Sequence, residues 1–592
     1  MAESMGNLRR THGCGEVTEP GMQVVVGGFV QYIRNKNKVI FLVLRDRSGE
    51  VQLVFNDETD REIFEKAASC KNEYVLLVKG HSVTRQDINP NMKTGNIEII
   101  AEEIRILAKA EPVPFMIMDD TNAGEEMRLK YRYLDLRRPS LQKNLIMRHK
   151  IAKCAREYFY ANDFIEIETP MMMKSTPEGA RDYLIPSRVH PGEFYALPQS
   201  PQIYKQLLMV AGMERYIQIA RCFRDEDLRA DRQPEFTQID LEMSFMDVED
   251  ILQLTEGFVQ KLIKDVLGQD VSLPIPRLSY QDAMNRYGSD KPDTRFAMEL
   301  QDVSDLVKDS GFSVFANAVQ SGGSVRCIVA KNAAKILSRK EIDKLTEFVR
   351  GIGAKGLAFI RWADEKPTCA FAKFFSDEAM QELLSRIDCQ QGDVALFVAD
   401  KNRITLSVLG ALRLEVAKKL EIIPEEKLNF LWITQFPFFE WDENSQTWLA
   451  MHHPFTMPED ECLQYLESDP GRVVAKAYDL VLNGIELSSG SMRITDYELQ
   501  EKMFRALGLT DEEIQAKFGF LVEAYHYGAP PHGGLGIGLD RLAMLLCKAE
   551  SLRDVVAFPK VKDASEIMSA CPSPVEQENL DVLGIMVKPQ ES

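Results

Sequence analysis

The sequence predicts an α+β protein of several domains, on the basis of three observations. The chain has 592 residues, which at roughly 100 to 200 residues per domain corresponds to three or four domains. Its first 108 residues contain five short apolar segments typical of strands, with one helical segment after the third. At residues 295–424 helical and strand-like segments alternate, and the polar motifs found on either side are absent. We therefore expect an N-terminal barrel and a main domain that is interrupted by an insertion.

Residues 1–108 are predicted to form an OB-fold barrel, because five strands with a helix between the third and the fourth are the pattern of that fold. The expected strands lie at 22–34, 38–46, 50–56, 73–83 and 96–107, and the helix at 60–69. OB-folds often bind single-stranded nucleic acid. The first 110 residues hold 15 basic and 15 acidic residues, so the net charge of −19 belongs to the rest of the chain.

Basic residues gather after the barrel. Residues 125–150 contain eight Lys and Arg against three Asp and Glu, so an RNA could bind there despite the negative total. We expect 109–140 to be a linker or hinge, 141–160 to be a helix, and 163–172 to be a strand that ends at its proline. The main domain is expected at 141–294 and 425–556, the insertion at 295–424, and a C-terminal extension at 557–592.

Composition limits the class of protein. Hydrophobic residues make up 45% and charged residues 27% of the chain, and no run of about 18 uncharged apolar residues occurs, so no membrane partner is expected. The N-terminus lacks the apolar core of a secretory signal, which places the protein in the cytoplasm. The ten cysteines are scattered without a C-x-x-C pair, which argues against a structural zinc site and against disulfides.

Two strand-like segments on either side of a charged loop carry polar side chains on one face. The period of two places Gln238, Asp240 and Glu242 together on the second segment, and Arg224 and Glu226 together on the first. Such alternation usually marks the solvated face of an antiparallel sheet. Here the polar face mixes arginine with several carboxylates, and the opposite face is apolar. This combination favours the polar floor of a binding site.

The turn Asn483-Gly484 is typical of a type I′ hairpin, which pairs Val481 with Glu486. Asp479 then lies on the same face as Glu486, as its diagonal neighbour across the strands. Two carboxylates in this arrangement could share a magnesium ion that keeps waters and phosphate oxygens as its other ligands. The alternative, with both side chains in water, is equally compatible with the spacing.

Other side chains depend on how regular the strands are. Arg493 lies seven residues beyond Glu486, so regular alternation turns it to the opposite face. A bulge at Gly490 would return it to the face of Glu486. The adjacent His452 and His453 cannot both face one site on a regular strand, and no third ligand at zinc spacing follows them.

A helix and a loop add two further candidate groups. Ser200 is expected as N-cap and Pro201 as the first helical residue, and Gln202 and Lys205 then share one helix face. Glu178, in a Gly-Ala context, could bind an ammonium group. The alternatives are an exposed amphipathic helix and an ordinary carboxylate in a surface loop.

The glycine-rich stretch GAPPHGGLGIGLDRLAMLL (528–546) has neither the ending of a P-loop nor the spacing of a dinucleotide-binding motif. Its bare backbone could lie along a flat ring, while Arg541, at the start of a helix, could hold a terminal phosphate. Tight packing of a strand against a helix is the alternative explanation.

Together these motifs resemble those of class II aminoacyl-tRNA synthetases. FIEIETP (164–170), FRDED and RQPEFTQIDLE (within 223–242) and GIGLDR (536–541) are similar to motifs 1, 2 and 3 of that class, in the same order. RYLDLRRP (132–139), TPEGARDYL (176–184), ALPQSPQ (196–202), MHHPFT (451–456) and AYDLVLNG (477–484) resemble the bacterial-type aspartyl enzymes. The resemblance covers nearly the whole chain and implies an antiparallel-sheet catalytic domain, an OB-fold anticodon domain and an inserted α/β domain of the GAD type.

The resemblance also implies a role for each candidate residue. The catalytic residues would be Arg224, Glu486 and Arg541. Aspartate would be bound by Glu178, Gln202, Lys205, Arg224, Asp240, His452 and Arg493. ATP would be bound by Arg224, Asp225, Glu226, Gln233, Glu486, Gly538, Leu539, Asp540 and Arg541. Asp479 and Glu486 would hold Mg²⁺, and Arg34, Phe41 and Gln52 would contact the tRNA anticodon.

These roles fit the chemistry of amino-acid activation. The substrate's α-carboxylate is already ionised when it attacks the α-phosphorus of ATP, so catalysis consists of positioning and of stabilising charge on phosphate oxygens. Asparagine has nearly the shape of aspartate, but its neutral amide would leave Lys205 and Arg493 without a counter-charge. Unpaired buried polar groups of this kind give rejection on the order of 10⁴-fold.

The sequence therefore predicts a ligase that forms aspartyl-adenylate from aspartate and ATP and transfers aspartate to tRNA(Asp), working as a homodimer and binding no DNA. Whether it also charges tRNA(Asn) is left open. The alternatives are an asparaginyl- or lysyl-tRNA synthetase, an amino-acid:AMP ligase on the same fold, and an inactive RNA-binding paralogue. Two segments depart from the family's pattern: QYIRNKNK (31–38) lacks an arginine-rich run, and ELSSGSMR (486–493) has Ser-Ser-Gly in place of three glycines.

Overall fold

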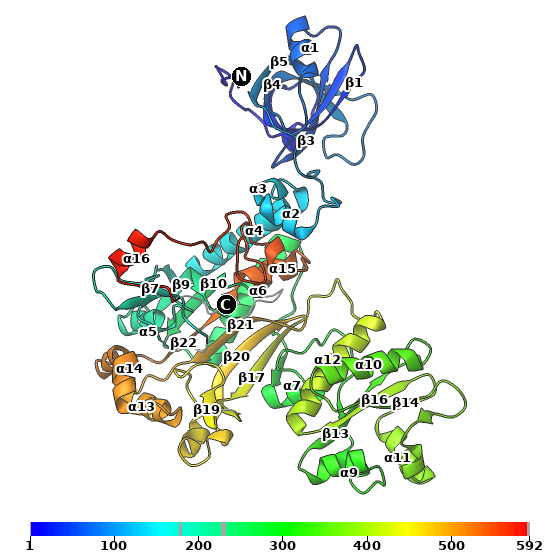
Figure 1. The fold of residues 1–592 in the computed structure, drawn as a ribbon, viewed down its shortest axis with the longest axis vertical. Helices are drawn as coiled ribbons and strands as arrows, with labels where there is room; N and C mark the ends of the chain where they lie inside the picture. The colour runs from blue at the N-terminus through cyan, green and yellow to red at the C-terminus, as the bar shows by residue number, and fades with distance from the viewer. Residues whose placement is uncertain (1, 177–179, 227–231, 444, 589–592) are drawn as a thin grey trace. The chain divides into compact units, whose positions relative to one another are not determined.

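The computed structural model describes residues 2–176, 180–226, 232–443 and 445–588, and the chain forms two compact units (Figure 1). The first unit comprises Met1–Ile146 and Ser565–Pro572, and the second comprises Met147–Ala564 and Ser573–Ser592. Among the helices described in these ranges, none combines the length and the apolar character needed to cross a membrane.

The first unit contains the predicted barrel. Its strands are β1 (Gln23–Asn35), β2 (Ile40–Asp46), β3 (Gly49–Phe55), β4 (Val75–Thr84) and β5 (Ile97–Ala108). They close in the order β1-β2-β3-β5-β4, and every pair is antiparallel except β3 with β5. Alternate residues fill the barrel, as Ile40, Leu42 and Leu44 of β2 do. Helix α1 (Arg61–Ala68) follows β3 and is capped by Asp60, whose carboxylate accepts two backbone N–H bonds. The OB-fold prediction is confirmed.

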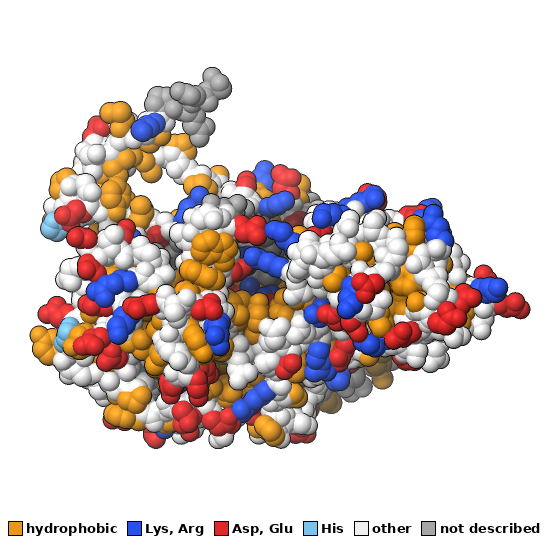
Figure 2. Space-filling model, turned by 90° about the horizontal axis from the view of Figure 1, so that it is seen from below, with side chains coloured by type: hydrophobic (Ala, Val, Ile, Leu, Met, Phe, Trp, Pro, Cys, Tyr) orange, Lys and Arg blue, Asp and Glu red, His pale blue; other side chains and the backbone are white. Residues whose placement is uncertain are grey.

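The basic segment after the barrel is partly neutralised by buried carboxylates. It forms the short helices α2 (Glu125–Lys130) and α3 (Arg132–Asp135). The fully buried Asp135 lies 2.7 Å from Arg132 Nη1 and 2.9 Å from Arg138 Nη1. Elsewhere Lys and Arg are interspersed with Asp and Glu over the face shown in Figure 2. RNA binding at residues 125–150 stays a prediction, with fewer available cations than the sequence suggests.

The second unit is built on an eight-stranded sheet. Its strands, from one edge to the other, are β11 (Arg277–Ser279), β17 (Phe430–Pro437), β20 (Val474–Leu482), β21 (Ile485–Met492), β22 (His532–Gly538), β10 (Glu235–Ser244), β9 (Arg215–Phe223) and β6 (Ile165–Glu166). All neighbours are antiparallel except the pairs β11–β17 and β6–β9 at the two edges. The antiparallel sheet expected from the resemblance is therefore present.

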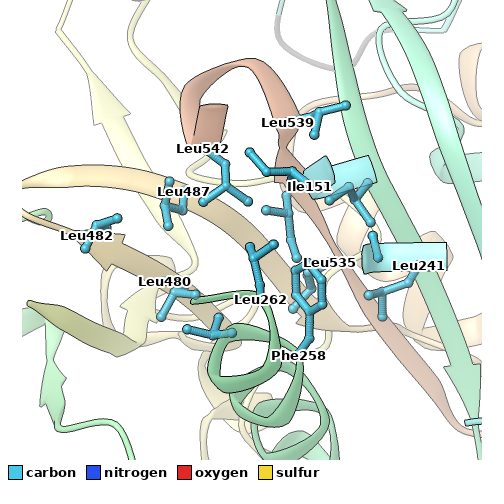
Figure 3. Close-up of a cluster of buried hydrophobic side chains, with 14 of the residues drawn as sticks. Ile151, Leu241, Phe258, Leu262, Leu480, Leu482, Leu487, Leu535, Leu539 and Leu542 are labelled. Carbon is cyan, nitrogen blue, oxygen red and sulfur yellow. The ribbon is translucent and has the colours of Figure 1, made fainter. Parts of the chain in front are cut away.

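Three helices cover one face of this sheet: α4 (Pro139–Tyr160), α6 (Val248–Leu267) and α15 (Leu539–Leu546). Figure 3 shows how they meet the strands, with Ile151 of α4, Phe258 and Leu262 of α6, and Leu542 of α15 against side chains of β10, β20, β21 and β22. Helix α6 begins at a capping box on Asp247 and ends at a left-handed glycine. The core on this face leaves the other face of the sheet for polar residues.

The insertion forms a five-stranded sheet in the order β12-β13-β16-β14-β15, with all neighbouring strands antiparallel. Its elements are β12 (Gln301–Asp302), α8 (Ser304–Val307), α9 (Ser313–Gln320), β13 (Ser324–Ala330), α10 (Arg339–Gly351), β14 (Ala358–Arg361), β15 (Thr368–Cys369), α11 (Asp377–Arg386), β16 (Val394–Asp400) and α12 (Asn402–Lys419). Separate apolar clusters lie on its two faces, so helices pack against both.

The remaining elements of the second unit are β7 (Leu184–Pro186), β8 (Phe194–Ala196), α5 (Gln202–Val210), α7 (Tyr280–Tyr287), β18 (Phe439–Asp442), β19 (Thr447–Ala450), α13 (Tyr497–Ala506), α14 (Asp511–His526) and α16 (Gln577–Leu583). Two predicted elements differ in length. The helix expected at 141–160 begins at Pro139, since proline fits the first turn of a helix. The strand expected at 163–172 is reduced to β6, whose two residues pair with β9 alone at the edge of the sheet.

Candidate active site

A cavity of about 470 Å³ lies over the polar face of the eight-stranded sheet. Alternation along β10 explains its lining, because Ile239 and Leu241 enter the core whereas Gln238 and Asp240 face the cavity. The predicted site residues that line it are Gln202, Lys205, Arg224, Glu226, Gln233, Asp240, His452, Asp479, Glu486, Arg493, Gly538, Asp540 and Arg541. The fold thus brings together groups from distant parts of the chain.

Lys205, Arg493 and Asp240 line the floor of the cavity, and Glu242, which is outside the lining, pairs with both cations. Lys205 Nζ lies 2.9 Å from Asp240 Oδ1 and 3.3 Å from Glu242 Oε2. Arg493 donates through Nε and Nη2 to the two carboxylate oxygens of Glu242, at 2.8 Å and 3.0 Å. None of the four residues is more than 4% exposed. The alternative that this strand face is solvated is therefore wrong.

Burial sets the electrostatics of this floor. Loss of hydration raises the pKa of Asp240, and the nearby Glu242 adds to the effect, although Lys205 opposes it. Burial acts on Glu242 in the same way, but Arg493 and Lys205 outweigh it and lower the pKa of that carboxyl group. Glu242 is thus the carboxylate that carries the charge opposite the two cations.

Helix α5 delivers Lys205 to the floor. It begins one residue later than predicted, with Pro201 before its first residue and Ser200 Oγ accepting the backbone N–H of Gln202 at 3.3 Å. Gln202 and Lys205 are both buried, so the alternative of an exposed amphipathic helix is wrong. The side-chain nitrogen of Gln202 has no hydrogen-bond partner among the described residues. Glu178, predicted to bind the ammonium group of the substrate, lies outside the described residues.

Both adjacent histidines line the cavity, because the chain leaves strand geometry after β19. His452 Nε2 is 3.5 Å from Asp479 Oδ1. Burial disfavours the charged form of His452, but Asp479 outweighs it and raises its pKa. His453 Nε2 is 2.7 Å from Arg493 Nη1, and burial together with that cation lowers its pKa well below the ordinary value. The constraint expected from a regular strand does not apply here.

The hairpin β20–β21 has the register that its turn predicts, with Val481 opposite Glu486. A bulge is also present, but it lies at Leu487, because Leu480 pairs with Ser488. The predicted position at Gly490 is wrong. The extra residue has the predicted effect, since it turns Arg493 to the face of Glu486.

The hairpin places Asp479 and Glu486 on the cavity. Asp479 is 6% exposed, and its Oδ1 has no hydrogen-bond partner among the described residues. Burial and the charge of Asp479 raise the pKa of Glu486, which Arg541 opposes. No cluster of three or more His, Cys, Asp or Glu suited to a metal occurs in the described ranges. A hard cation at the two carboxylates would therefore need further oxygen ligands from a bound molecule or from water.

Two arginines border the cavity. The guanidinium carbon of Arg224 is 5.1 Å from the centre of the Phe236 ring, and its Nε has no hydrogen-bond partner among the described residues. Arg541 Nη1 donates to the backbone oxygen of Glu486 at 3.1 Å and lies 3.7 Å from its Oε1. Both guanidinium groups are only partly buried, so they can reach a ligand in the cavity.

Two predicted ATP-binding side chains are already bound within the protein. Gln233 exchanges two hydrogen bonds with the backbone of Lys560, at 2.8 Å and 3.1 Å. Asp540 accepts the backbone N–H of Thr237 at 2.9 Å and is paired with Arg148 at 2.6 Å. Asp540 therefore fastens α15 to β10 and α4, and direct contact of its carboxylate with ATP is not required to explain its position.

The other predicted ATP-binding residues differ in accessibility. Asp225 does not line the cavity and lies 3.5 Å from Arg181 Nε. Glu226 lines it and is paired with Arg232 at 2.9 Å. The side chain of Leu539 lies in the core on the opposite face, so only its backbone could contact a nucleotide (Figure 3).

The glycines of β22 make room for the carboxylates of β10. A Cβ on Gly534 would lie 2.1 Å from the backbone oxygen of Leu241 and 2.3 Å from Glu242 Oε2. A Cβ on Gly536 would lie 3.5 Å from Asp240 Oδ1. Tight packing therefore explains why residue 534 is a glycine. Gly536 lines the cavity, as expected if its bare backbone lies along a flat ring of a ligand.

On the barrel, the predicted anticodon residues occupy different environments. Phe41 of β2 is half-buried, lies outside the barrel core and pairs with the exposed Arg34. Lys36 Nζ is 5.8 Å from the centre of its ring. Gln52 is 5% exposed and donates to Glu98 at 2.8 Å. The alternative that Phe41 belongs to the barrel core is therefore wrong. The amide of Gln52 is already hydrogen-bonded to Glu98 within the barrel.

Three groups in or next to the site received no individual role from the sequence. Alternation places Glu242 on the polar face, and the structure shows it outside the cavity lining, paired with Lys205 and Arg493. His453 was set aside because a regular strand was assumed. Asp290, which lines the cavity, lies just before the insertion in a segment without a recognisable pattern.

Comparisons with known proteins agree on one family. Residues 124–562 match the family of tRNA synthetases class II (D, K and N), and residues 24–107 match the OB-fold nucleic acid binding domain. An aspartate–tRNA ligase of Ruminiclostridium cellulolyticum is 56% identical over 99% of this chain and its own entire length. An aspartate–tRNA(Asp/Asn) ligase of Geobacillus sp. is 55% identical over 98% of this chain and 99% of its own.

Solved structures are similar in fold. Asparaginyl-tRNA synthetase of Pyrococcus horikoshii, complexed with asparaginyl-adenylate, has a TM-score of 0.58 at 18% identity and covers 93% of this chain and 98% of its own. Aspartyl-tRNA synthetase of Entamoeba histolytica has a TM-score of 0.56 at 18% identity and covers 94% of this chain and 92% of its own.

Proposed function

We propose how the cavity acts in a chain that belongs to the class II tRNA synthetases of the aspartate, lysine and asparagine group and, within that group, to the aspartate–tRNA ligases. The chain is therefore a ligase that forms aminoacyl-tRNA. Aspartate and ATP bind over the polar face of the eight-stranded sheet. The α-carboxylate of aspartate attacks the α-phosphorus of ATP, and pyrophosphate leaves. A hydroxyl at the 3′ end of tRNA then attacks the carbonyl carbon of the aspartyl-adenylate, and AMP leaves.

The buried pair Lys205 and Arg493 is the observation that carries this proposal. Both cations lie at the floor of the cavity, where they bind the side-chain carboxylate of aspartate. Glu242 holds Arg493 through two hydrogen bonds, and Asp240 holds Lys205. Two cations face the one charged carboxylate of Glu242, so a neutral asparagine side chain would leave a buried positive charge uncompensated, which is costly in a desolvated site.

The phosphate end of the cavity stabilises negative charge. We assign Arg224 to the α-phosphate and the substrate carboxylate, and Arg541 to the γ-phosphate. Since a carboxylate is already ionised, the chain needs no general base for the first step. Its residues bind and orient the two substrates and keep water away from them.

The residues present fit a magnesium ion. Asp479 offers a buried oxygen without a hydrogen-bond partner among the described residues, and its charge helps to raise the pKa of Glu486 beside it, a repulsion that a shared cation would relieve. When bound, magnesium would neutralise phosphate charge. Asp479 and Glu486 would hold it, and His452, next to Asp479, would help to close the site over aspartate.

For the tRNA partner we propose that the barrel binds the anticodon through Arg34 and Phe41. The relatives that are 52–55% identical are named aspartate–tRNA(Asp/Asn) ligases. We therefore propose that this chain also charges tRNA(Asn). Charging of both tRNA transcripts in parallel tests this, and charging of tRNA(Asp) alone would contradict it.

We further propose that the enzyme is a cytoplasmic homodimer. The segment 164–170 and its neighbours expose apolar side chains that a second copy would cover, including Tyr160, Ile165 and Met172, which are 46%, 51% and 57% exposed. Sedimentation at micromolar concentration measures the oligomeric state.

The test of the catalytic proposal is amino-acid-dependent ATP–pyrophosphate exchange, run with magnesium and with each of the twenty amino acids in turn. Exchange supported by aspartate alone is expected. Exchange with asparagine or lysine would show that the floor of the cavity has been assigned to the wrong side chain.

A further inference from the structure

The segment Asp290–Met298 connects the catalytic sheet to the insertion. It follows α7, and β12 begins the inserted sheet at Gln301. One end of the segment, at Asp290, lines the cavity, and the other end is bound by a buried arginine of the insertion. The segment therefore links the cavity physically to the insertion.

Arg413 of α12 fixes the far end of the segment. It is 1% exposed, and its guanidinium group donates to the backbone oxygens of Asp293, Phe296, Ala297 and Met298 at 2.8–3.0 Å. The guanidinium carbon also lies 3.9 Å from the centre of the Phe296 ring. A planar donor group with four carbonyl acceptors determines the course of the backbone around it.

The same segment touches the turn of the hairpin that carries Asp479 and Glu486. A Cβ on Gly484 would lie 3.0 Å from the Cβ of Asp293, so the turn packs closely against the segment. Asn429 donates from its side chain to Thr294 and from its backbone to Asn483. Movement of the segment would thus be transmitted to the hairpin.

Asp290 adds negative charge beside that hairpin. It is paired with Lys291 at 2.9 Å, and it lines the same cavity as Asp479 and Glu486. It is not arranged as a direct ligand, since the described residues show no cluster of three metal-binding groups. Asp479 is buried, with His452 Nε2 3.5 Å from its Oδ1, and it is the carboxylate that would share a cation with Glu486 at this end of the cavity.

We propose that Asp290 strengthens the binding of the divalent cation with ATP by its charge, and that the insertion keeps Asp290 in place through the positioning residue Arg413. This inference rests on the proposed magnesium site at Asp479 and Glu486. It gives the insertion a role in catalysis, because the insertion orders a segment that borders the nucleotide.

The test uses Mn²⁺ as the probe, with unbound Mn²⁺ counted by its paramagnetic resonance signal in the presence of ATP and the full chain. Asp290→Asn is expected to weaken Mn²⁺ binding about tenfold, as loss of an outer-sphere group does. Arg413→Met should weaken it by a similar factor, and the double variant by no more than the larger single effect, because both act by one route. The KM for ATP should rise while the KM for aspartate stays unchanged.

Arg361→Met is the matched control, because Arg361 also donates to backbone oxygens, those of Ala334 and Leu337, but within the insertion. It should bind Mn²⁺ as the wild type does. The Asp290 side chain is 34% exposed, so unchanged Mn²⁺ binding in Asp290→Asn would overturn the proposal even if Arg413→Met fails to fold. If the factors by which the two single changes weaken Mn²⁺ binding multiply in the double variant, Asp290 and Arg413 act separately, and the proposal that Arg413 acts through Asp290 is overturned. A wild-type chain that binds no Mn²⁺ with ATP would overturn the magnesium site itself, and this inference with it.

Discussion

Arg493 and Glu242 form a buried two-point ion pair across β22, with Nε 2.8 Å from Oε1 and Nη2 3.0 Å from Oε2. Arg493 directly follows β21, Glu242 lies in β10, and these two strands are the neighbours of β22. The pair crosses at Gly534, where a Cβ would collide with Glu242. Glu242 therefore determines where Arg493 presents its remaining donors to the cavity.

Replacing Glu242 by Gln should weaken both folding and aspartate binding. The change removes the charge opposite two buried cations, and loss of one partner of such a group costs about 3 kcal/mol. We expect a matching decrease in the free energy of unfolding, measured in urea, and at least a tenfold rise in the KM for aspartate. Glu235→Gln, on the same strand but partly exposed and paired with Arg221, is the control and should cost less than about 1 kcal/mol. Equal effects of the two changes would refute the orienting role of Glu242.

Replacing Arg493 by Ala should remove the preference for aspartate. Truncating one partner of a buried charge pair costs about 2 to 5 kcal/mol, so kcat/KM for aspartate in pyrophosphate exchange should fall at least about thirtyfold. Any residual exchange at high asparagine concentration should change much less, since asparagine does not use the positive charge. Arg505→Ala, on the exposed surface of α13, is the matched control and should be active. Parallel losses for both amino acids would point to a structural role alone.

Replacing Gly534 by Ala should destabilise the second unit. The added Cβ would lie 2.1 Å from the backbone oxygen of Leu241, which cannot move without breaking the β10–β22 pairing, so a cost of about 1 to 3 kcal/mol is expected. Gly351→Ala, where no atom lies within 4 Å of the new Cβ, should be neutral or slightly stabilising. Urea unfolding of both variants measures the difference, and a neutral Gly534→Ala would contradict the packing explanation.

These residues also show what the sequence alone can reveal. Local signals were sufficient for the barrel strands, for the hairpin at Asn483-Gly484 and for the common face of Asp240 and Glu242, because turn chemistry and the period of two act between near neighbours. The burial of that face depends on β21 and β22, which lie hundreds of residues away, so alternation alone could not separate it from a solvated face. The bulge at Leu487 and the irregular chain at His453 likewise arise from packing that no local pattern records.

The stability of the protein should fall in mild acid, in part because of His532. Burial lowers the pKa of this fully buried histidine, and Arg493 and Lys205 add to the effect, although Glu242 opposes it. Below the ordinary pKa of about 6.5 the unfolded chain binds a proton that the folded chain does not, so stability decreases by up to about 1.4 kcal/mol per pH unit from this residue. His532→Gln should flatten the decrease between pH 6.5 and 5. The exposed His190→Gln is the control, and identical slopes in all three proteins would contradict the assignment.

Replacing Phe41 by Ala should impair tRNA charging without affecting amino-acid activation. Phe41 lies outside the barrel core, beside Arg34 and Lys36, so its ring can stack on a base while the two cations bind phosphates. Loss of a stacked base costs about 1 to 3 kcal/mol, which corresponds to roughly a fivefold to hundredfold decrease in kcat/KM for tRNA. Phe41→Tyr keeps the aromatic face and should retain charging, whereas Phe41→Leu keeps only apolar area and should not. Equal charging by the Tyr and Leu variants would show that the ring supports the barrel and does not stack on a base, because only stacking distinguishes the two replacements.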